Sequence, residues 1–211
     1  PEQGIRKMRH EDILNFEEIL RVVRALAKLG VRKVRLTGGE PLVREGILEL
    51  IKNIRQVEGI EVIALTTNGV LLPKMAEGLR AAGLDYVNVS LDSLNEETFS
   101  FLTRRPALGQ VKEGLRALEE AGFTDTKINC VPLAGINEED VLSLAELARE
   151  KPLKRRFIEL MPIGCAYEAG LRGLPMDEGR ERLREGFGEF TQVKPGKSLR
   201  GPAEYVRPRG F

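Results

Sequence analysis

The feature of this sequence that most restricts its fold is a regular alternation of short β-branched runs with longer amphipathic segments. Each short run predicts a strand, and a segment with helical spacing of its apolar residues precedes each of them. The predicted strands cover residues 32–37, 61–66, 86–91, 126–131 and 155–160. This order is typical of parallel βαβ units with right-handed crossovers. We therefore predict an α/β fold, which periodicity alone leaves as either an open sheet or a partly closed barrel.

Helix signals stand between the predicted strands. Asn15 can cap the first helix, Glu18 completes a capping box three positions later, and Gly30 ends the helix. Its apolar residues share one face, which we expect to pack on the sheet: Phe16, Ile19, Leu20, Val23, Leu26 and Leu29. Further helices are predicted over residues 44–57, 73–82, 108–121 and 137–149, with Asn137 as the cap of the last and with Gly83 and Gly122 as terminators.

The pattern weakens after residue 163. A glycine-rich stretch covers residues 164–173, an amphipathic helix is predicted over 176–187, and a polar tail contains a predicted strand at 203–207. We divide the chain into a core of residues 1–164 and a truncated C-terminal extension of residues 165–211. We expect the extension to lie across the barrel.

Composition excludes several classes of function. The 33 Lys and Arg residues balance 32 Asp and Glu residues, which argues against a nucleic-acid arm or a membrane-surface patch. The two cysteines cannot build a disulfide framework or a four-thiolate metal site within one chain, which favours a reducing compartment. Because the sequence has no apolar run of 18 residues and no signal-like start, we expect a cytoplasmic protein.

Polar residues cluster where the predicted strands end. Thr37 to Pro41 follow the first strand, Thr66 to Gly69 end the second, and Ser90 to Ser93 end the third. Ligands of parallel α/β proteins bind beyond these carboxyl ends, so the clusters are candidates for a binding site. Taken singly, each cluster is also typical of an ordinary turn or helix cap.

Four cations, Lys33, Arg35, Lys127 and Arg156, alternate with apolar residues inside the predicted strands. Some of them should point into a barrel lumen, where a charge is costly unless it is paired or meets an anion. One interpretation is a basic interior that binds phosphates. The alternative is that Lys33 faces solvent and that Arg156 pairs with an acidic side chain, either Glu159 or Glu40.

Five segments together resemble the GTP 3′,8-cyclase family of radical S-adenosylmethionine (SAM) enzymes, over about residues 4–164: RKVRLTGGEPLVR, LTTNGVLL, NVSLDSL, KINCVPLAGIN and RFIELMPIG. The resemblance implies a partial TIM-type barrel, here lacking its first strand, in the radical SAM fold. It also implies a lyase that converts GTP to (8S)-3′,8-cyclo-7,8-dihydroguanosine 5′-triphosphate, the first step of molybdenum cofactor biosynthesis. In that family a 5′-deoxyadenosyl radical takes the ribose 3′ hydrogen, and the ribose radical attacks carbon 8 of guanine.

The resemblance also implies the site residues. Gly38, Gly39 and Glu40 would receive the amino group of SAM, Ser90 would contact its polar part, and Met161 would lie near its adenine. GTP would be held by Lys33, Arg35, Thr66, Lys127 and Arg156. The role of these residues would be placement and exclusion of water, and no side chain is expected to be catalytic, His10 included.

The family's iron–sulfur ligands are not in this sequence. The family holds one [4Fe–4S] cluster through a CxxxCxxC loop and a second through three C-terminal cysteines, whereas Cys130 and Cys165 match neither set. We expect Cys130 to be a buried strand thiol and Cys165 a loop thiol. The sequence resembles a chain trimmed at both ends; either the intact protein carries both clusters or it lacks their ligands. This chain alone is expected to be inactive.

The resemblance implies several partners: GTP, an electron donor, the downstream cyclic pyranopterin monophosphate synthase of the pathway, and a second copy in a homodimer, but no nucleic acid or membrane. Two other functions remain open. The chain could be a nucleotide-binding α/β scaffold without catalysis, or a radical SAM enzyme with a different substrate. The four strand cations favour GTP over a peptide.

Overall fold

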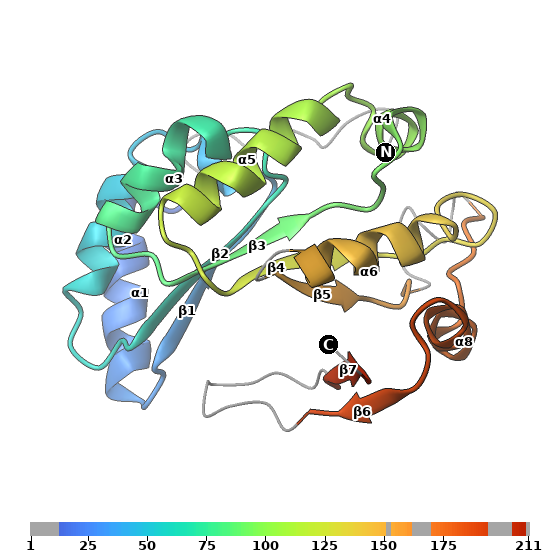
Figure 1. The fold of residues 1–211 in the computed structure, drawn as a ribbon. Coiled ribbons are helices and arrows are strands. Elements are labelled where there is room, and N and C mark those ends of the chain that lie inside the picture. Colours follow the sequence, from blue (N-terminus) through green and yellow to red (C-terminus); the bar gives the residue numbers. More distant parts are fainter. Residues whose placement is uncertain (1–12, 151–152, 162–169, 194–203, 210–211) are drawn as a thin grey trace. The chain divides into compact units, whose positions relative to one another are not determined.

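A computed structural model describes residues 13–150, 153–161, 170–193 and 204–209 of the chain (Figure 1). The chain divides into two compact units. The first unit comprises Pro1–Val89 and Gln110–Phe123, and the second comprises Ser90–Gly109 and Thr124–Phe211. Every predicted strand of the core is present, and helices alternate with strands along the chain. The described elements therefore confirm the predicted α/β class.

Three parallel strands form the sheet of the first unit: β1 (Lys33–Leu36), β2 (Val62–Thr67) and β3 (Tyr86–Ser90). In the register of β1 and β2, Arg35 lies opposite Ala64. In the register of β2 and β3, Thr67 lies opposite Val89. Ile63 of β2 and other apolar residues of these strands are completely buried, as expected for strands whose faces are covered in an α/β unit.

The helices of the first unit cover this sheet: α1 (Phe16–Lys28), η2 (Pro41–Val43), α2 (Ile47–Arg55), α3 (Leu72–Ala81) and α5 (Leu108–Glu120). Figure 1 shows α2, α3 and α5 gathered along the same side of the strands. A Cβ atom on Gly114 of α5 would stand only 2.7 Å from the carbonyl oxygen of Gly69, so glycine permits the close approach of α5 to the segment after β2.

The first helix confirms the predicted cap and corrects the predicted face. The Glu18 amide donates to Asn15 Oδ1 over 2.9 Å, and the Asn15 amide donates to Glu18 Oε2 over 2.8 Å. However, Leu26 is 41% exposed and Leu29 is 83% exposed. The buried stripe follows Leu20, Val23 and Ala27. Leu26 lies about 100° around the helix from Ala27, and Leu29 follows the last helical residue, so neither belongs to this stripe.

Glycine conformations set two boundaries in the first unit. The helix predicted over residues 44–57 begins only at Ile47, because Gly46 before it adopts a φ of +77°. The predicted terminator Gly83 has a φ of +94° and is confirmed after α3. Both conformations lie in the left-handed region that glycine adopts readily.

The second unit contains the parallel strands β4 (Thr126–Cys130) and β5 (Leu153–Phe157) with the helices α4 (Glu96–Thr103) and α6 (Asp140–Glu150). The strand predicted at 155–160 is shifted toward the N-terminus, because its pairing with β4 begins at Leu153 and ends where Phe157 lies opposite Cys130. The sequence analysis missed α4, whose cap is Asn95: its side chain accepts from the Thr98 amide.

The predicted cap of α6 is wrong. The helix begins at Asp140, and Asn137 is buried in the preceding turn. There the Asn137 side chain accepts from the Leu133 amide over 2.6 Å and donates to the Asp92 carbonyl over 2.7 Å. It therefore joins two loops of the second unit rather than capping a helix.

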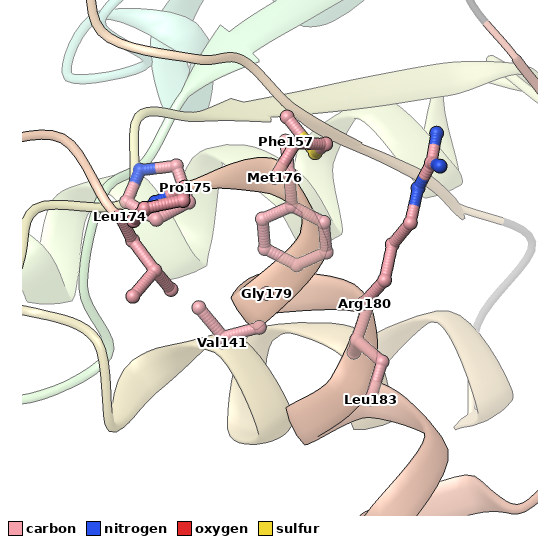
Figure 2. Close-up of a pocket in the computed structure, with 9 residues that line it drawn as sticks. Val141, Phe157, Leu174, Pro175, Met176, Gly179, Arg180 and Leu183 are labelled. Carbon is pink, nitrogen blue, oxygen red and sulfur yellow. The ribbon is translucent and has the colours of Figure 1, made fainter.

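The C-terminal part contains the predicted helix α8 (Met176–Phe187) and an antiparallel pair, β6 (Phe190–Gln192) and β7 (Val206–Pro208). The predicted strand at 203–207 corresponds to β7, and β6 was not predicted. A small apolar cavity of about 20 Å³ lies beneath α8, with Val141, Phe157 and Leu183 in its lining (Figure 2). The cavity is at most water-sized and carries no ligand site.

The predicted boundary between residues 164 and 165 lies outside the described residues, as does the glycine-rich stretch up to residue 169. The division into core and extension therefore remains a prediction. In the part of the chain that the structure describes, none of the helices combines the length and apolar character needed to cross a membrane.

Candidate functional site

An open glycine loop follows β1 in the first unit. Thr37, Gly38 and Gly39 are all exposed. A Cβ atom on either glycine would meet no described heavy atom within 4 Å, so packing does not require glycine here. Gly38 has a φ of +153°, at the edge of the region that side chains rarely adopt. The loop thus presents accessible backbone at the carboxyl end of a parallel strand, where ligands of this fold class bind.

Glu40 fastens this loop to the end of β2. Its Oε1 atom accepts from the Leu42 amide over 3.0 Å and from the Thr67 hydroxyl over 2.7 Å. Its Oε2 atom accepts from the Asn68 amide over 2.7 Å. Two segments 27 residues apart in sequence are therefore held together by one carboxylate, and Glu40 also caps η2.

Ordinary turn bonds also occur after β2, as the sequence suggested. The Gly69 amide donates to Thr67 Oγ1 over 3.1 Å, and the Val70 amide donates to Asn68 Oδ1 over 3.0 Å. The sequence analysis missed the long-range bonds to Glu40. No local pattern could have shown them, because they depend on β1 and β2 being neighbours.

Two of the predicted GTP ligands meet in the first unit. The Arg35 Nη1 atom donates to Thr66 Oγ1 over 3.2 Å, which joins neighbouring strands. Arg35 is exposed, whereas Lys33 and Thr66 are half-buried. Because Lys33 and Arg35 are two residues apart on β1, they share one face of the sheet. The first unit thus combines two cations, a threonine hydroxyl and the glycine loop.

The second unit places Lys127 and Arg156 on a common polar face. In the register of β4 and β5, Asn129 lies opposite Arg156, and Lys127 is two residues from Asn129 on the same face. Lys127 and Arg156 are half-buried. Within the described residues Arg156 has no ion pair with Glu159, so that alternative is not supported. The Asn129 Oδ1 atom is buried and accepts no hydrogen bond from the described chain.

Arg155 points to the opposite side of β5. Its Nε atom donates to the Leu144 carbonyl of α6 over 2.5 Å. Burial lowers the pKa of Arg155 to about 10, because the charged guanidinium loses hydration. Alternation along β5 therefore separates Arg155, beneath a helix, from Arg156, on the polar face.

Two further predicted SAM ligands belong to the second unit. Ser90 is exposed at the end of β3, and the next residue, Leu91, donates its amide to the Asn129 carbonyl over 2.9 Å. Met161 follows β5 and is 64% exposed. Both side chains are accessible, and Ser90 is attached through the backbone to the strand that carries Lys127.

A polar network that the sequence analysis missed fixes the segment after Ser90. Asp92 Oδ1 accepts from the Val131 amide over 2.8 Å, and Ser93 Oγ donates to Asp140 Oδ2 over 2.7 Å. Burial raises the pKa of Asp92, against the smaller opposite effect of the Val131 bond. An Asp and a Ser directly after a predicted strand were the available signal, but their partners lie about 40 residues away.

The described residues do not fit an iron–sulfur cluster. Cys130 is buried on β4, as predicted, and its thiol donates to the Asp92 carbonyl over 3.7 Å. Burial, and then the charges of Asp92 and Asp140, raise the pKa of this thiol, whereas cluster ligands are thiolates. Among the described residues no three His, Cys, Asp or Glu side chains gather as metal ligands. Cys165 and His10 lie outside the described residues.

The sequence is similar to one known protein family and to several named relatives. The profile of the Radical SAM superfamily matches residues 2–148. A GTP 3′,8-cyclase of Pelotomaculum thermopropionicum is 44% identical over 209 residues, which are 98% of this chain and 64% of that protein. A GTP 3′,8-cyclase of Geobacter sulfurreducens is 40% identical over 210 residues, which are 100% of this chain and 64% of that protein. The chain thus spans slightly less than two thirds of these relatives.

Solved structures share the fold. SuiB of Streptococcus suis, bound to S-adenosylmethionine, superposes with a TM-score of 0.70 at 19% identity over 85% of this chain and 42% of that chain. Coproporphyrinogen III oxidase of Escherichia coli, a radical SAM enzyme, superposes with a TM-score of 0.60 at 19% identity over 83% of this chain and 46% of that chain. At this identity the likeness concerns the fold alone, and it confirms the predicted one.

Proposed function

The chain belongs to the radical SAM superfamily, and its identity to relatives named GTP 3′,8-cyclase leads us to propose that the protein is such a cyclase, the lyase that begins molybdenum cofactor biosynthesis. The observation that carries the proposal lies within one unit. The open loop at Gly38 and Gly39, fastened by Glu40, stands beside the hydrogen-bonded pair of Arg35 and Thr66. A site for SAM and a site for a nucleotide would thus share the ends of β1 and β2.

In the first unit, SAM would bind through the glycine loop and Glu40. For Ser90 and Met161, which belong to the second unit, contacts with SAM are implied by the family resemblance. The exposed backbone of Gly38 and Gly39 fits a ligand that approaches closely, and the Glu40 carboxylate fits an ammonium group. When bound, SAM supplies the radical chemistry of the superfamily. The chain's own residues orient the two ligands and exclude water.

GTP would be held by cations on sheet faces. Arg35 and Arg156 can bind phosphate oxygens in bidentate fashion, and Lys33 and Lys127 add point charges. The Thr66 hydroxyl, which already accepts from Arg35, would contact the ribose or a phosphate. The half-burial of Lys33, Lys127 and Arg156 supports this role, because partial desolvation strengthens their attraction to an anion.

The family resemblance also implies cofactors and partners for the protein. An electron donor and two [4Fe–4S] clusters would be required, with cluster ligands other than the described residues. The product would pass to the cyclic pyranopterin monophosphate synthase, and the protein would form a homodimer. We assign no side chain of this chain to a cluster.

One reconstitution experiment separates the candidate functions. The protein from its complete reading frame is loaded anaerobically with iron and sulfide and then supplied with dithionite, SAM and GTP. A GTP 3′,8-cyclase yields 5′-deoxyadenosine and the cyclised nucleotide together. Binding of GTP without 5′-deoxyadenosine identifies a nucleotide-binding scaffold, and 5′-deoxyadenosine without conversion of GTP identifies a different substrate.

A further inference from the structure

Thr67 stands at the centre of the junction between the glycine loop and β2, yet the predicted ligand set does not include it. The residue is the last of β2 and is 2% exposed. Its hydroxyl donates to Glu40 Oε1 over 2.7 Å and accepts from the Gly69 amide over 3.1 Å. A buried hydroxyl with both functions satisfied holds its partners in fixed directions.

The contacts of Glu40 leave its carboxylate partly available. Oε1 accepts from the Leu42 amide and from Thr67, and Oε2 accepts from the Asn68 amide. A carboxylate offers about four acceptor positions. Within the described residues, three are therefore used, and one position on Oε2 remains. That position belongs to the residue directly after Gly39 and has the charge that an ammonium group requires.

We propose that Thr67 is a positioning residue that acts through Glu40 and sets the direction in which the remaining acceptor of Oε2 meets a primary ammonium group. The inference rests on the proposed function, because the ligand with this ammonium is SAM. Without the Thr67 hydroxyl, Oε1 keeps only the Leu42 amide and the carboxylate can rotate. The ammonium then meets a less ordered acceptor, and SAM binds more weakly.

A role in packing alone predicts a different result. Thr67 lies opposite Val89 in the sheet, where a branched side chain packs well. The turn after it has a second bond that does not involve Thr67, from the Val70 amide to Asn68 Oδ1. Thr67→Val therefore keeps the branched shape while it removes the hydroxyl, with its bond to Glu40 and its bond from the Gly69 amide. Thr67→Ser keeps the hydroxyl and removes the methyl group, so the two variants separate the two roles.

The test measures binding of three SAM-related ligands, and of GTP as a control, to the cluster-reconstituted full-length protein by equilibrium dialysis. SAM and decarboxylated SAM both carry the ammonium group, and 5′-methylthioadenosine lacks it. Thr67→Val should weaken SAM and decarboxylated SAM by the same factor, about tenfold, as expected for one weakened charge-assisted hydrogen bond. Binding of 5′-methylthioadenosine and of GTP should change less than twofold. Thr67→Ser should restore SAM affinity to within about threefold of the wild type.

A second variant covers a failure of Thr67→Val to fold, which thermal unfolding would show. Glu40→Gln should also weaken both ammonium ligands and spare 5′-methylthioadenosine. Where both variants fold, their effects in the double mutant should be less than additive, because both act on one acceptor. An equal loss for all three ligands would overturn the inference in favour of packing, and so would no loss.

The outcomes separate this inference from the proposed function. If the wild type binds SAM and Thr67→Val binds it equally well, only the inference is overturned. If the wild type binds no SAM, the proposed function is overturned and the role of Thr67 with it.

Discussion

The two units of the molecule each contain a carboxylate that joins the ends of separate segments, and the two junctions differ in what they leave accessible. In the first unit, Glu40 accepts from the Asn68 amide over 2.7 Å. In the second, Asp92 accepts from the Val131 amide over 2.8 Å. Glu40 stands beside an open glycine loop, whereas Asp92 is sufficiently desolvated that its pKa is raised. The same kind of hydrogen-bonded carboxylate thus borders the proposed ligand site in one unit and holds two loops together in the other.

The largest effect should come from the second junction. Asn137→Ala removes a buried side-chain amide that bonds Leu133 and Asp92, and it leaves the Leu133 amide unpaired and the Asp92 carbonyl with only the weak thiol donor of Cys130. We expect a loss of roughly 3 kcal/mol in the free energy of unfolding, measured by urea denaturation. The control Ser143→Ala, on an exposed helical serine, should change it by less than about 0.5 kcal/mol. A small loss for Asn137→Ala would contradict a cohesive role.

The strand cations should affect ligand affinity rather than stability. Arg35→Ala and Arg156→Ala should each weaken GTP binding by about tenfold or more, because a charge-assisted contact to phosphate is lost. SAM binding should change much less. Arg180→Ala, which removes a 2.6 Å ion pair with Glu204, serves as a matched control and should leave GTP affinity unchanged. Isothermal titration calorimetry with both ligands checks this. An equal loss of GTP and SAM affinity would contradict the assignment of these two arginines to GTP.

Glycine replacements should distinguish the glycine loop after β1 from the turn that follows β2. Gly69→Ala places a Cβ 2.9 Å from Val89 Cγ1 at a φ of +85°, so it should cost about 1–3 kcal/mol in the free energy of unfolding. Gly39→Ala meets open space and should cost less than about 0.5 kcal/mol, while it weakens SAM binding. Thermal unfolding and SAM titration of both variants test this. Similar destabilisation by both variants would mean that packing, not a ligand, requires Gly39.

The smallest effect concerns pH. Burial raises the folded-state pKa of Asp92 above its ordinary value of 3.8, so the folded protein binds the proton more tightly than the unfolded chain. The contribution of Asp92 is therefore greatest below about pH 4 and is lost as the pH rises through the folded-state pKa. Asp92→Asn, which keeps an acceptor for the Val131 amide, should gain stability relative to the wild type between pH 4 and pH 8. The free energy of unfolding of both proteins is measured across this range. A difference between Asp92→Asn and the wild type that stays constant from pH 4 to pH 8 would contradict this expectation.

The parts of the fold that depend on local sequence were predicted. The capping box at Asn15 involves residues three positions apart, and α8 was located at both ends because its amphipathic pattern is self-contained. The buried face of α1 was only partly predicted, because periodicity does not show where the helix axis meets the sheet. Leu29 fits the pattern in sequence and lies outside the helix.

The sequence proposed a set of site residues, which stays a prediction, and it could not supply their contacts. In the structure, alternation along β5 places Arg156 and its neighbour Arg155 on opposite faces, a separation that the sequence analysis did not address. The partners of Glu40 and Asn137 could not be derived, because they lie on segments that only the tertiary fold brings together. The bonds from the Thr67 hydroxyl to Glu40 and from the Val131 amide to Asp92 each span more than 25 residues of chain.

The chain leaves the first unit after Val89 and re-enters it at Gln110. The first unit is thus assembled from two stretches of sequence with part of the second inserted between them. A single recombination breakpoint between Gly39 and Gly114 separates the glycine loop from helix α5, whose Gly114 approaches the turn at Gly69. A breakpoint after Phe123 keeps the loop and the helix together, but it also transfers Ser90–Gly109 of the second unit. A chimera of related enzymes that exchanges the first unit alone therefore needs further breakpoints, one on each side of this inserted segment.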